Sequence, residues 1–197
     1  MEITQIAPGL RYWTAPHPEW RGATDWPEEV GCVYYEAADA IVLIDPLLRN
    51  GEGDEIWPML DAAIERSGLP VTVLLTAAWH ARSAPVVAER YGAAVWVRDS
   101  PDLLPTGVEL FVPAGSSEGQ VAFFLRPHYA LAVGDLFMGA NGGLRVCPSP
   151  ALLDKDAFDE SLRTLLDLPI DHVLVSHGEP VLHDGRRRIA EALGIDG

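Results

Sequence analysis

Three side chains that can bind a metal ion stand next to apolar runs that read as strands. His80 lies in the loop 76–82, and Asp135 and His177 each adjoin a glycine. Two imidazoles and one carboxylate form a ligand set that suits zinc or iron(II). These residues therefore indicate a candidate metal site, provided that the fold brings them together.

The elements that must position these side chains are short strands and helices. Two β-rich runs at 32–36 and 40–44 are expected to form a hairpin around 37–39. Further strands are expected at 71–75, 93–97, 109–112, 121–125, 130–133 and 173–175, with a turn at 126–128. Helical spacing of apolar residues predicts helices over 54–67, 84–91, 154–166 and 184–193.

These elements predict an α/β architecture. Each half of the chain ends in a strand, a loop and a helix. Apolar strands of this kind are buried on both faces when two sheets pack together with helices outside. Loops at one edge of such a sandwich would meet in a cleft. At 197 residues, the chain is expected to form one domain, residues 1–197.

The charge of the chain excludes some classes of partner. Acidic residues outnumber basic residues 29 to 14, which gives a formal net charge of −15. A protein that binds nucleic acid or an anionic membrane needs the opposite balance, so we expect neither partner. No signal peptide or membrane span is visible, and we expect a cytoplasmic protein. The oligomeric state is open.

Four segments, in order, resemble the metallo-β-lactamase superfamily. They are an early strand that ends in Asp, a strand that leads to Thr, a Gly-Asp-x-Leu-Phe segment and a strand that delivers His-Gly. Here they lie at Ile41–Asp45, Leu74–Thr76, Ala132–Phe137 and Val173–Gly178. The resemblance covers roughly residues 1–185 and implies a four-layer αββα sandwich of the metallo-β-lactamase type.

The metal-binding motif of that superfamily is degenerate in this chain. The motif His-x-His-x-Asp-His should follow the Thr, and a further His should lie in a Pro-Gly-His-like segment. Carried over by position, these ligands fall on Ala77, Trp79, Ala81, Arg82 and Ser116. Only Asp135 and His177 remain from the ligand set. Two ligands cannot hold two ions, so the resemblance implies a retained scaffold without the two-metal site.

Two replacements for the lost ligands are open. His80 could join Asp135 and His177 and complete a site for one zinc or iron(II) ion. Alternatively, Arg82 could replace the cation and pair with Asp135, directly or through water, because a buried charge needs a partner. A third reading leaves Arg82 pointing to solvent. The cleft candidates are therefore Trp79, His80, Arg82, Ser116, Asp135 and His177.

Two other segments have both an ordinary and a functional reading. Residues 13–28 are aromatic and rich in proline, and are expected to be an irregular loop that packs on the sandwich or covers the cleft. Residues 139–143 are rich in glycine and are interpreted as a plain turn. The remaining histidines are interpreted as structural or surface residues; they are His17, His128, His172 and His183.

Three functions are compatible with these residues. The first is a non-catalytic or catalytically altered member of this fold that binds a small molecule or a partner and needs no cofactor. The second is a hydrolase with one zinc or iron(II) ion on Asp135, His177 and His80. A metal-free hydrolase ranks last, because no activated nucleophile is visible.

Overall fold

A computed structural model of the chain describes residues 3–22, 26–48, 55–100, 104–116, 119–147 and 152–195. Its larger sheet has six strands in the order β1-β2-β3-β4-β5-β6. Neighbouring strands are antiparallel from β1 to β4 and parallel from β4 to β6. The strands are β1 (Ile3–Ala7), β2 (Leu10–Pro16), β3 (Glu29–Glu36), β4 (Ile41–Ile44), β5 (Val71–Leu74) and β6 (Ala94–Trp96).

The second sheet has four strands in the order β12-β9-β8-β7, and only β12 and β9 are parallel. A separate hairpin is formed by β10 and β11. The strands are β7 (Val108–Phe111), β8 (Ala122–Leu125), β9 (Ala130–Gly134), β10 (Phe137–Ala140), β11 (Gly143–Val146) and β12 (His172–Val175).

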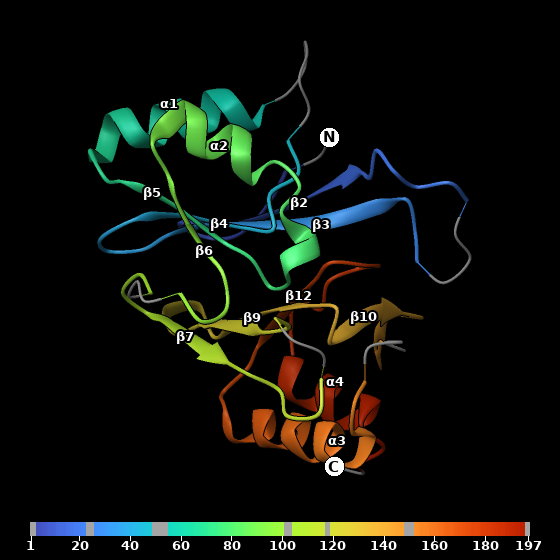
Figure 1. The fold of residues 1–197 in the computed structure, drawn as a ribbon. Helices are drawn as coiled ribbons and strands as arrows, with labels where there is room; N and C mark the ends of the chain where they lie inside the picture. Colours follow the sequence, from blue (N-terminus) through green and yellow to red (C-terminus); the bar gives the residue numbers. More distant parts are fainter. Residues whose placement is uncertain are drawn as a thin grey trace.

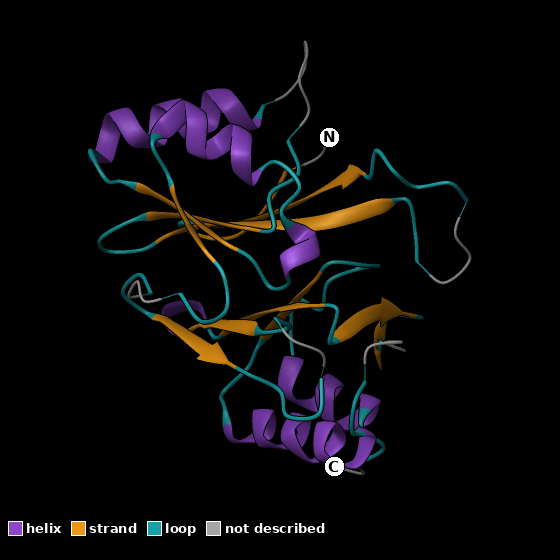
Figure 2. Ribbon diagram, in the orientation of Figure 1, coloured by secondary structure: helices purple, strands orange, loops and turns teal. Residues whose placement is uncertain are grey.

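The two larger sheets form the inner layers of a four-layer sandwich, and helices cover both outer faces (Figures 1 and 2). Helices α1 (Ile56–Ser67) and α2 (Ala84–Tyr91) lie on the six-stranded sheet. Helices α3 (Lys155–Arg163) and α4 (Gly185–Ala192) lie on the four-stranded sheet. No helix among the described residues is long and apolar enough to cross a membrane.

The alternation of side chains along the strands builds three separate apolar cores. In β4, Val42 and Ile44 point into the core between the sheets, whereas Ile41 and Leu43 pack under α1 and α2. In β8, Phe123 faces the first core and Phe124 faces α3 and α4. Strands that are buried on both faces need apolar residues at every position, which explains the continuous runs in the sequence.

The two sheets approach each other closely at one edge. Gly31 in β3 donates its N–H to Ser176 O at 2.8 Å, and a Cβ on Gly31 would lie 2.1 Å from Val175 O. Tyr12 from β2 also donates its hydroxyl to Val175 O at 3.0 Å. Nearby, Gly134 has a φ of +54°, and a Cβ there would lie 2.4 Å from Thr76 Oγ1. Glycine is therefore required at both positions.

The predicted hairpin, the helices and most of the strands are confirmed, with ends shifted by a few residues. The start of the first predicted helix, residue 54, lies outside the described residues. Two interpretations are wrong. Residues 13–16 belong to β2 rather than to an irregular loop. Gly139 and Gly143 belong to β10 and β11, so that only the tip of this segment is a turn.

Candidate functional site

The candidate residues lie where strands of both sheets end. Asp45 follows β4 and Thr76 comes two residues after the end of β5, at the parallel side of the larger sheet. Asp135 follows β9, and His177 comes two residues after β12. Carboxyl ends of parallel strands gather at one edge of a sheet, and here the edges of two sheets face each other. Residues far apart in the sequence therefore meet at this edge.

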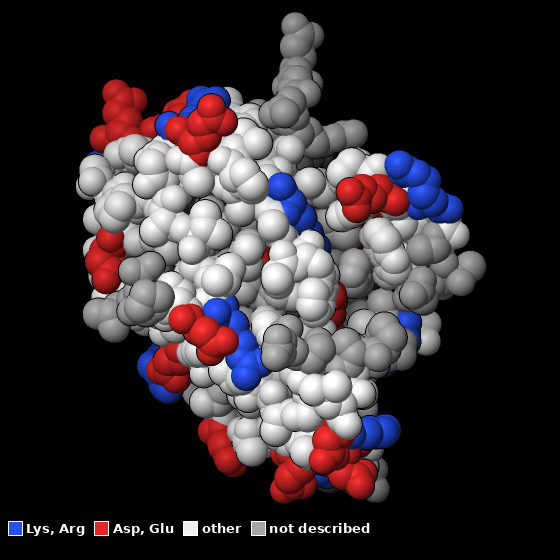
Figure 3. Space-filling view, in the orientation of Figure 1, with Lys and Arg blue, Asp and Glu red and all other residues white. Residues whose placement is uncertain are grey.

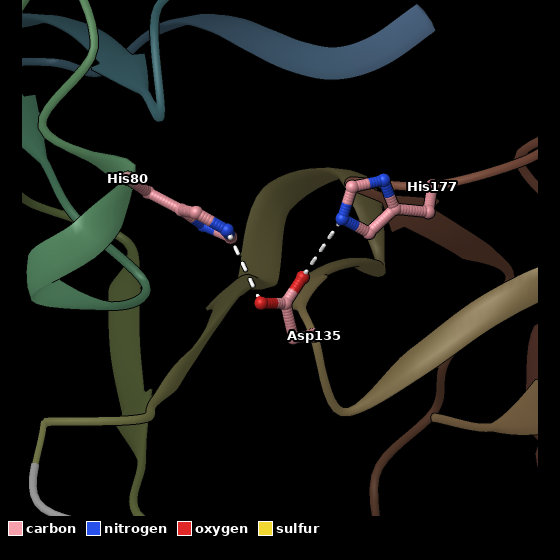
Figure 4. Close-up of side chains that lie close together, drawn as sticks. All are labelled: His80, Asp135 and His177. Atoms are coloured by element: carbon pink, nitrogen blue, oxygen red, sulfur yellow. Dashed lines mark ion pairs between the residues drawn. The ribbon is translucent and has the colours of Figure 1, made fainter. Parts of the chain in front are cut away.

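His80, Asp135 and His177 lie close together, as Figure 4 shows. Their metal-binding atoms all lie within 4.8 Å of one another. The carboxylate of Asp135 stands between the two imidazoles, with Oδ2 at 3.3 Å from His80 Nε2 and Oδ1 at 3.3 Å from His177 Nε2. The fold thus brings together the three candidate ligands that the sequence suggested.

His80 is fixed from behind by residues of the larger sheet. It lies at the end of the short helix η1 (Ala78–His80), and only 4% of its surface is exposed. Its Nδ1 lies 2.9 Å from Asp45 Oδ2 and 2.9 Å from Thr76 Oγ1. Asp45 also accepts the backbone N–H and the hydroxyl of Thr76. These contacts direct Nε2 of His80 toward Asp135.

The two carboxylates control the charge of the site. Burial alone would lower the pKa of His80, but Asp45 and Asp135 outweigh it and raise this pKa from 6.5 to about 9. Burial would raise the pKa of Asp135, but its contacts with His177, His80 and Trp79 hold it well below 3.8. In the protein without metal, an imidazolium at position 80 and a carboxylate at position 135 stabilise each other.

Trp79 contacts Asp135 directly. Its indole Nε1 donates a hydrogen bond to Asp135 Oδ2 at 3.0 Å. The ring is 51% exposed and stands nearly perpendicular to the ring of His80, at 6.2 Å between centroids. Trp79 therefore supplies a hydrogen-bond donor to the candidate site.

The proposed direct pair between Arg82 and Asp135 is wrong for the residues that the structure describes. Arg82 Nη1 donates instead to the carbonyl oxygens of Gly31 and Asp45, at 3.0 and 2.9 Å. Carbonyl oxygens at the strand ends attract the guanidinium as a carboxylate would, and Asp135 already has its own partners. Arg82 thus links β3 and β4 behind the site, and it does not point freely to solvent.

Ser116 and the segment 13–28 have different relations to the site. Ser116 is buried, and its hydroxyl donates to Pro113 O at 3.4 Å. Trp13 is buried and donates to Leu47 O, so it belongs to the core. Trp26 does reach the site, because its ring lies 5.2 Å from that of His177, and the ring of His17 lies 5.5 Å from that of Trp26.

The three ligand side chains fit a single divalent ion. Two atoms bound at ~2.0–2.1 Å to a tetrahedral zinc ion are about 3.3 Å apart. His80 Nε2 and His177 Nε2 each lie 3.3 Å from Asp135, the first from Oδ2 and the second from Oδ1, which exceeds the ~2.7–2.9 Å of a charged hydrogen bond. Asp135 Oδ1 is buried and has no aligned hydrogen bond among the described residues, so that its contact with His177 is electrostatic only. Asp45 behind His80 matches the usual support of a metal-binding imidazole.

The sequence reasoning missed two supporting residues and one further cluster. The sequence identifies Asp45 only as the end of a strand and Thr76 only as part of the motif, although together they orient His80. A second group of possible ligands consists of Asp171, before β12, His172, the first residue of β12, and His183, after that strand. His183 is 84% exposed there, and Nδ1 of His172 bonds Leu182 O at 2.6 Å. This group is a surface cluster separate from the site.

Solved structures with the same fold are those of metallo-β-lactamase-type proteins. A metallo-β-lactamase from Erythrobacter litoralis, with β-mercaptoethanol in its active site, aligns with a TM-score of 0.68 and 16% identity, over 98% of this chain and 95% of that one. A superfamily protein from the archaeon Sulfolobus tokodaii aligns with a TM-score of 0.63 and 18% identity, over 93% and 84% of the two chains. No protein-family model and no curated protein matches the chain. The chain has the metallo-β-lactamase fold, as the sequence predicted.

Proposed function

We propose that this metallo-β-lactamase-fold protein is a hydrolase that works with one metal ion, bound by His80, Asp135 and His177. The observation that carries the proposal is the gathering of two imidazoles and one carboxylate, whose metal-binding atoms all lie within 4.8 Å of one another. Three protein ligands with an open position are typical of catalytic zinc. A bound zinc or iron(II) ion would supply Lewis acidity, which polarises a carbonyl or phosphoryl oxygen and acidifies water.

The protein residues have separate tasks in this proposal. Asp45 accepts a hydrogen bond from the protonated Nδ1 of His80, so that Nε2 carries the lone pair needed for a metal. Asp135 brings negative charge, and His177 brings the second imidazole from the other end of the chain. Trp79 holds Asp135 Oδ2 and leaves Oδ1 without an aligned hydrogen bond. The set of ligands supports one ion, since the other motif positions carry side chains that bind no metal.

A second candidate function is a metal-free cleft that binds a small molecule. This reading, which the sequence ranked first, is favoured by one observation: His80, His177 and Trp79 already surround the carboxylate of Asp135. Such a site is electrostatically satisfied without an ion. The support for the metal reading is the lack of aligned hydrogen bonds in the two 3.3 Å contacts, because a purely protein network would be expected to close them.

Zinc titration by calorimetry separates the two functions. We expect one equivalent of zinc to bind chelator-treated protein, and we expect the affinity to fall at least about a hundredfold in His80→Ala and in Asp135→Asn, because three ligands become two. His128→Ala, in the turn between β8 and β9, is the matched control and should bind as the unmodified protein does. Metal content below about a tenth of an equivalent, and no zinc binding by calorimetry, would favour the metal-free cleft instead.

The hydrolase proposal also needs an activity. A panel of carboxylic ester, thioester, lactam and phosphodiester substrates should include at least one that the zinc-loaded protein cleaves and the chelated protein does not. Loss of that cleavage in Asp135→Asn would assign the activity to this site, provided that circular dichroism shows the variant to be folded. Zinc binding without cleavage of any member would leave a metal-binding protein and refute the hydrolase.

A further inference from the structure

The indole of Trp79 is an exposed apolar surface at the candidate site. About half of its surface, 51%, is accessible, although tryptophan is usually well buried. It is directly connected to the site, because Nε1 bonds Asp135 Oδ2 at 3.0 Å. A large apolar side chain in such a place has no evident role in folding, since it belongs to none of the three buried cores.

The position of this indole is fixed by its neighbours. Its Nε1 is held by Asp135, and the next residue, His80, is buried against Asp45 and Thr76. The backbone turns tightly in η1, where His80 N–H donates to Ala77 O at 3.0 Å. A ring that is already ordered loses little side-chain entropy when a ligand covers it, which makes tryptophan an efficient contact residue.

The charge pattern around the indole favours an uncharged ligand group. Asp135 is held between two histidines, and Arg82 is directed to backbone carbonyls behind the site. Figure 3 shows uncharged atoms over much of the middle of this face, with a few basic and acidic groups among them and others over the outer helices. Because the indole N–H is already used, the ring presents only its aromatic face and carbon edge to a ligand.

We propose that Trp79 is a specificity-determining residue whose exposed face binds a planar apolar group of the substrate, such as an aromatic ring. Aromatic rings attract each other through offset or edge-to-face contacts beyond simple burial. The placement of this group beside the reacting bond rests on the proposed hydrolase function. The binding of the group needs only the fixed indole, so it is expected in the chelated protein as well.

Ligand-observed NMR titration of chelated protein tests the proposal with two matched probes, N-benzylacetamide and N-methylacetamide. We expect the benzyl probe to bind roughly two- to tenfold more tightly, the range that one aromatic contact provides. Trp79→Ala should abolish this preference. Tyr129→Ala removes a ring of equal exposure, 51%, in the turn between β8 and β9, and should leave the preference unchanged.

A further variant tests the anchoring of the ring. Trp79→Phe keeps an aromatic face but lacks the N–H that bonds Asp135, so the preference for the benzyl probe should fall without vanishing. The indole N–H signal that disappears in this variant identifies Trp79, and in the unmodified protein it should shift when the benzyl probe binds. The melting temperatures of both Trp79 variants should stay close to that of the unmodified protein, since the side chain is exposed.

Three results would overturn the proposal: equal affinity for the two probes, a preference that survives in Trp79→Ala, or a preference lost equally in Tyr129→Ala. These results do not depend on zinc. Protein that binds zinc but does not distinguish the probes would refute this inference and keep the proposed function. Protein that distinguishes the probes but binds no zinc would do the reverse.

Discussion

Replacement of Asp45 by Asn should reveal how strongly the protein stabilises the charged form of His80. Asp45 is buried, with only 3% of its surface exposed. Asn has nearly the same shape as Asp but carries no charge. The substitution weakens two kinds of contact at once. One is with the backbone N–H and hydroxyl of Thr76, and the other is with Nδ1 of His80 at 2.9 Å.

The magnitude follows from the pKa of His80 in the chelated protein. A rise from 6.5 to about 9 corresponds to about 3 kcal/mol of unfolding free energy. Asp45 and Asp135 share this effect, so removing the charge of Asp45 should cost roughly 1–2 kcal/mol through His80. Because the pKa is raised on folding, this contribution is complete below pH 6.5 and is lost as the pH rises through about 9.

Urea unfolding in the presence of chelator, near pH 6 and near pH 10, measures this effect. The destabilisation of Asp45→Asn should be larger near pH 6 by roughly 1–2 kcal/mol. Asp39→Asn is a close control, because Asp39 accepts the N–H and hydroxyl of Thr106 in the same way but contacts no histidine. Its effect should be equal at both pH values. An equal effect of Asp45→Asn at both values would refute the reasoning.

Three further substitutions test the packing at the site and the start of helix α3. Gly134→Ala should destabilise the folded protein by roughly 3 kcal/mol or more, measured by thermal unfolding, because the added Cβ would clash with Thr76. Gly142 is also at positive φ but in open space, so Gly142→Ala should cost only about 1 kcal/mol. Arg82→Gln should lower stability by roughly 1–3 kcal/mol in urea while leaving zinc stoichiometry unchanged; a changed stoichiometry would contradict its role behind the site. Asp154→Ala should cost about 1 kcal/mol, since Asp154 accepts the N–H of Ala157 at the start of α3, and Asp156→Ala, which makes no such cap, is the comparison.

The strands and helices were predictable where local signals were strong. Continuous apolar runs identified the central strands, and the glycines that end α1 and α2 both adopt the left-handed conformation. The β10–β11 hairpin also had a signal, because Asn141 and Gly142 form its tip with φ values of 51° and 74°. Because glycine is abundant in this segment, the Asn-Gly pair that favours a hairpin turn is not singled out. Strand β2 is not predicted from the sequence, and one reason is the proline at its end, Pro16. A strand tolerates proline at such a position.

The site was predictable only as a set of residues, and its geometry came from contacts between distant parts of the chain. The order of motifs placed Asp135 and His177 correctly at strand ends. The partner of His80 could not be read in this way, because Asp45 meets it through the parallel pairing of β4 with β5. The same holds for Arg82, whose carbonyl partners come from β3 and from the end of β4.

The junction of the two sheets makes the candidate ligand set an internal cross-link between the halves of the chain. His80 is carried by the first half, whereas Asp135 and His177 are carried by the second. An ion bound to all three would resist any motion that separates the sheets, and it would stabilise the folded state by about 4 kcal/mol at a thousand times its dissociation constant. Fragments that each hold one half would then associate more tightly in the presence of zinc. The bound ion would then stabilise the contact between the two sheets as well as take part in catalysis.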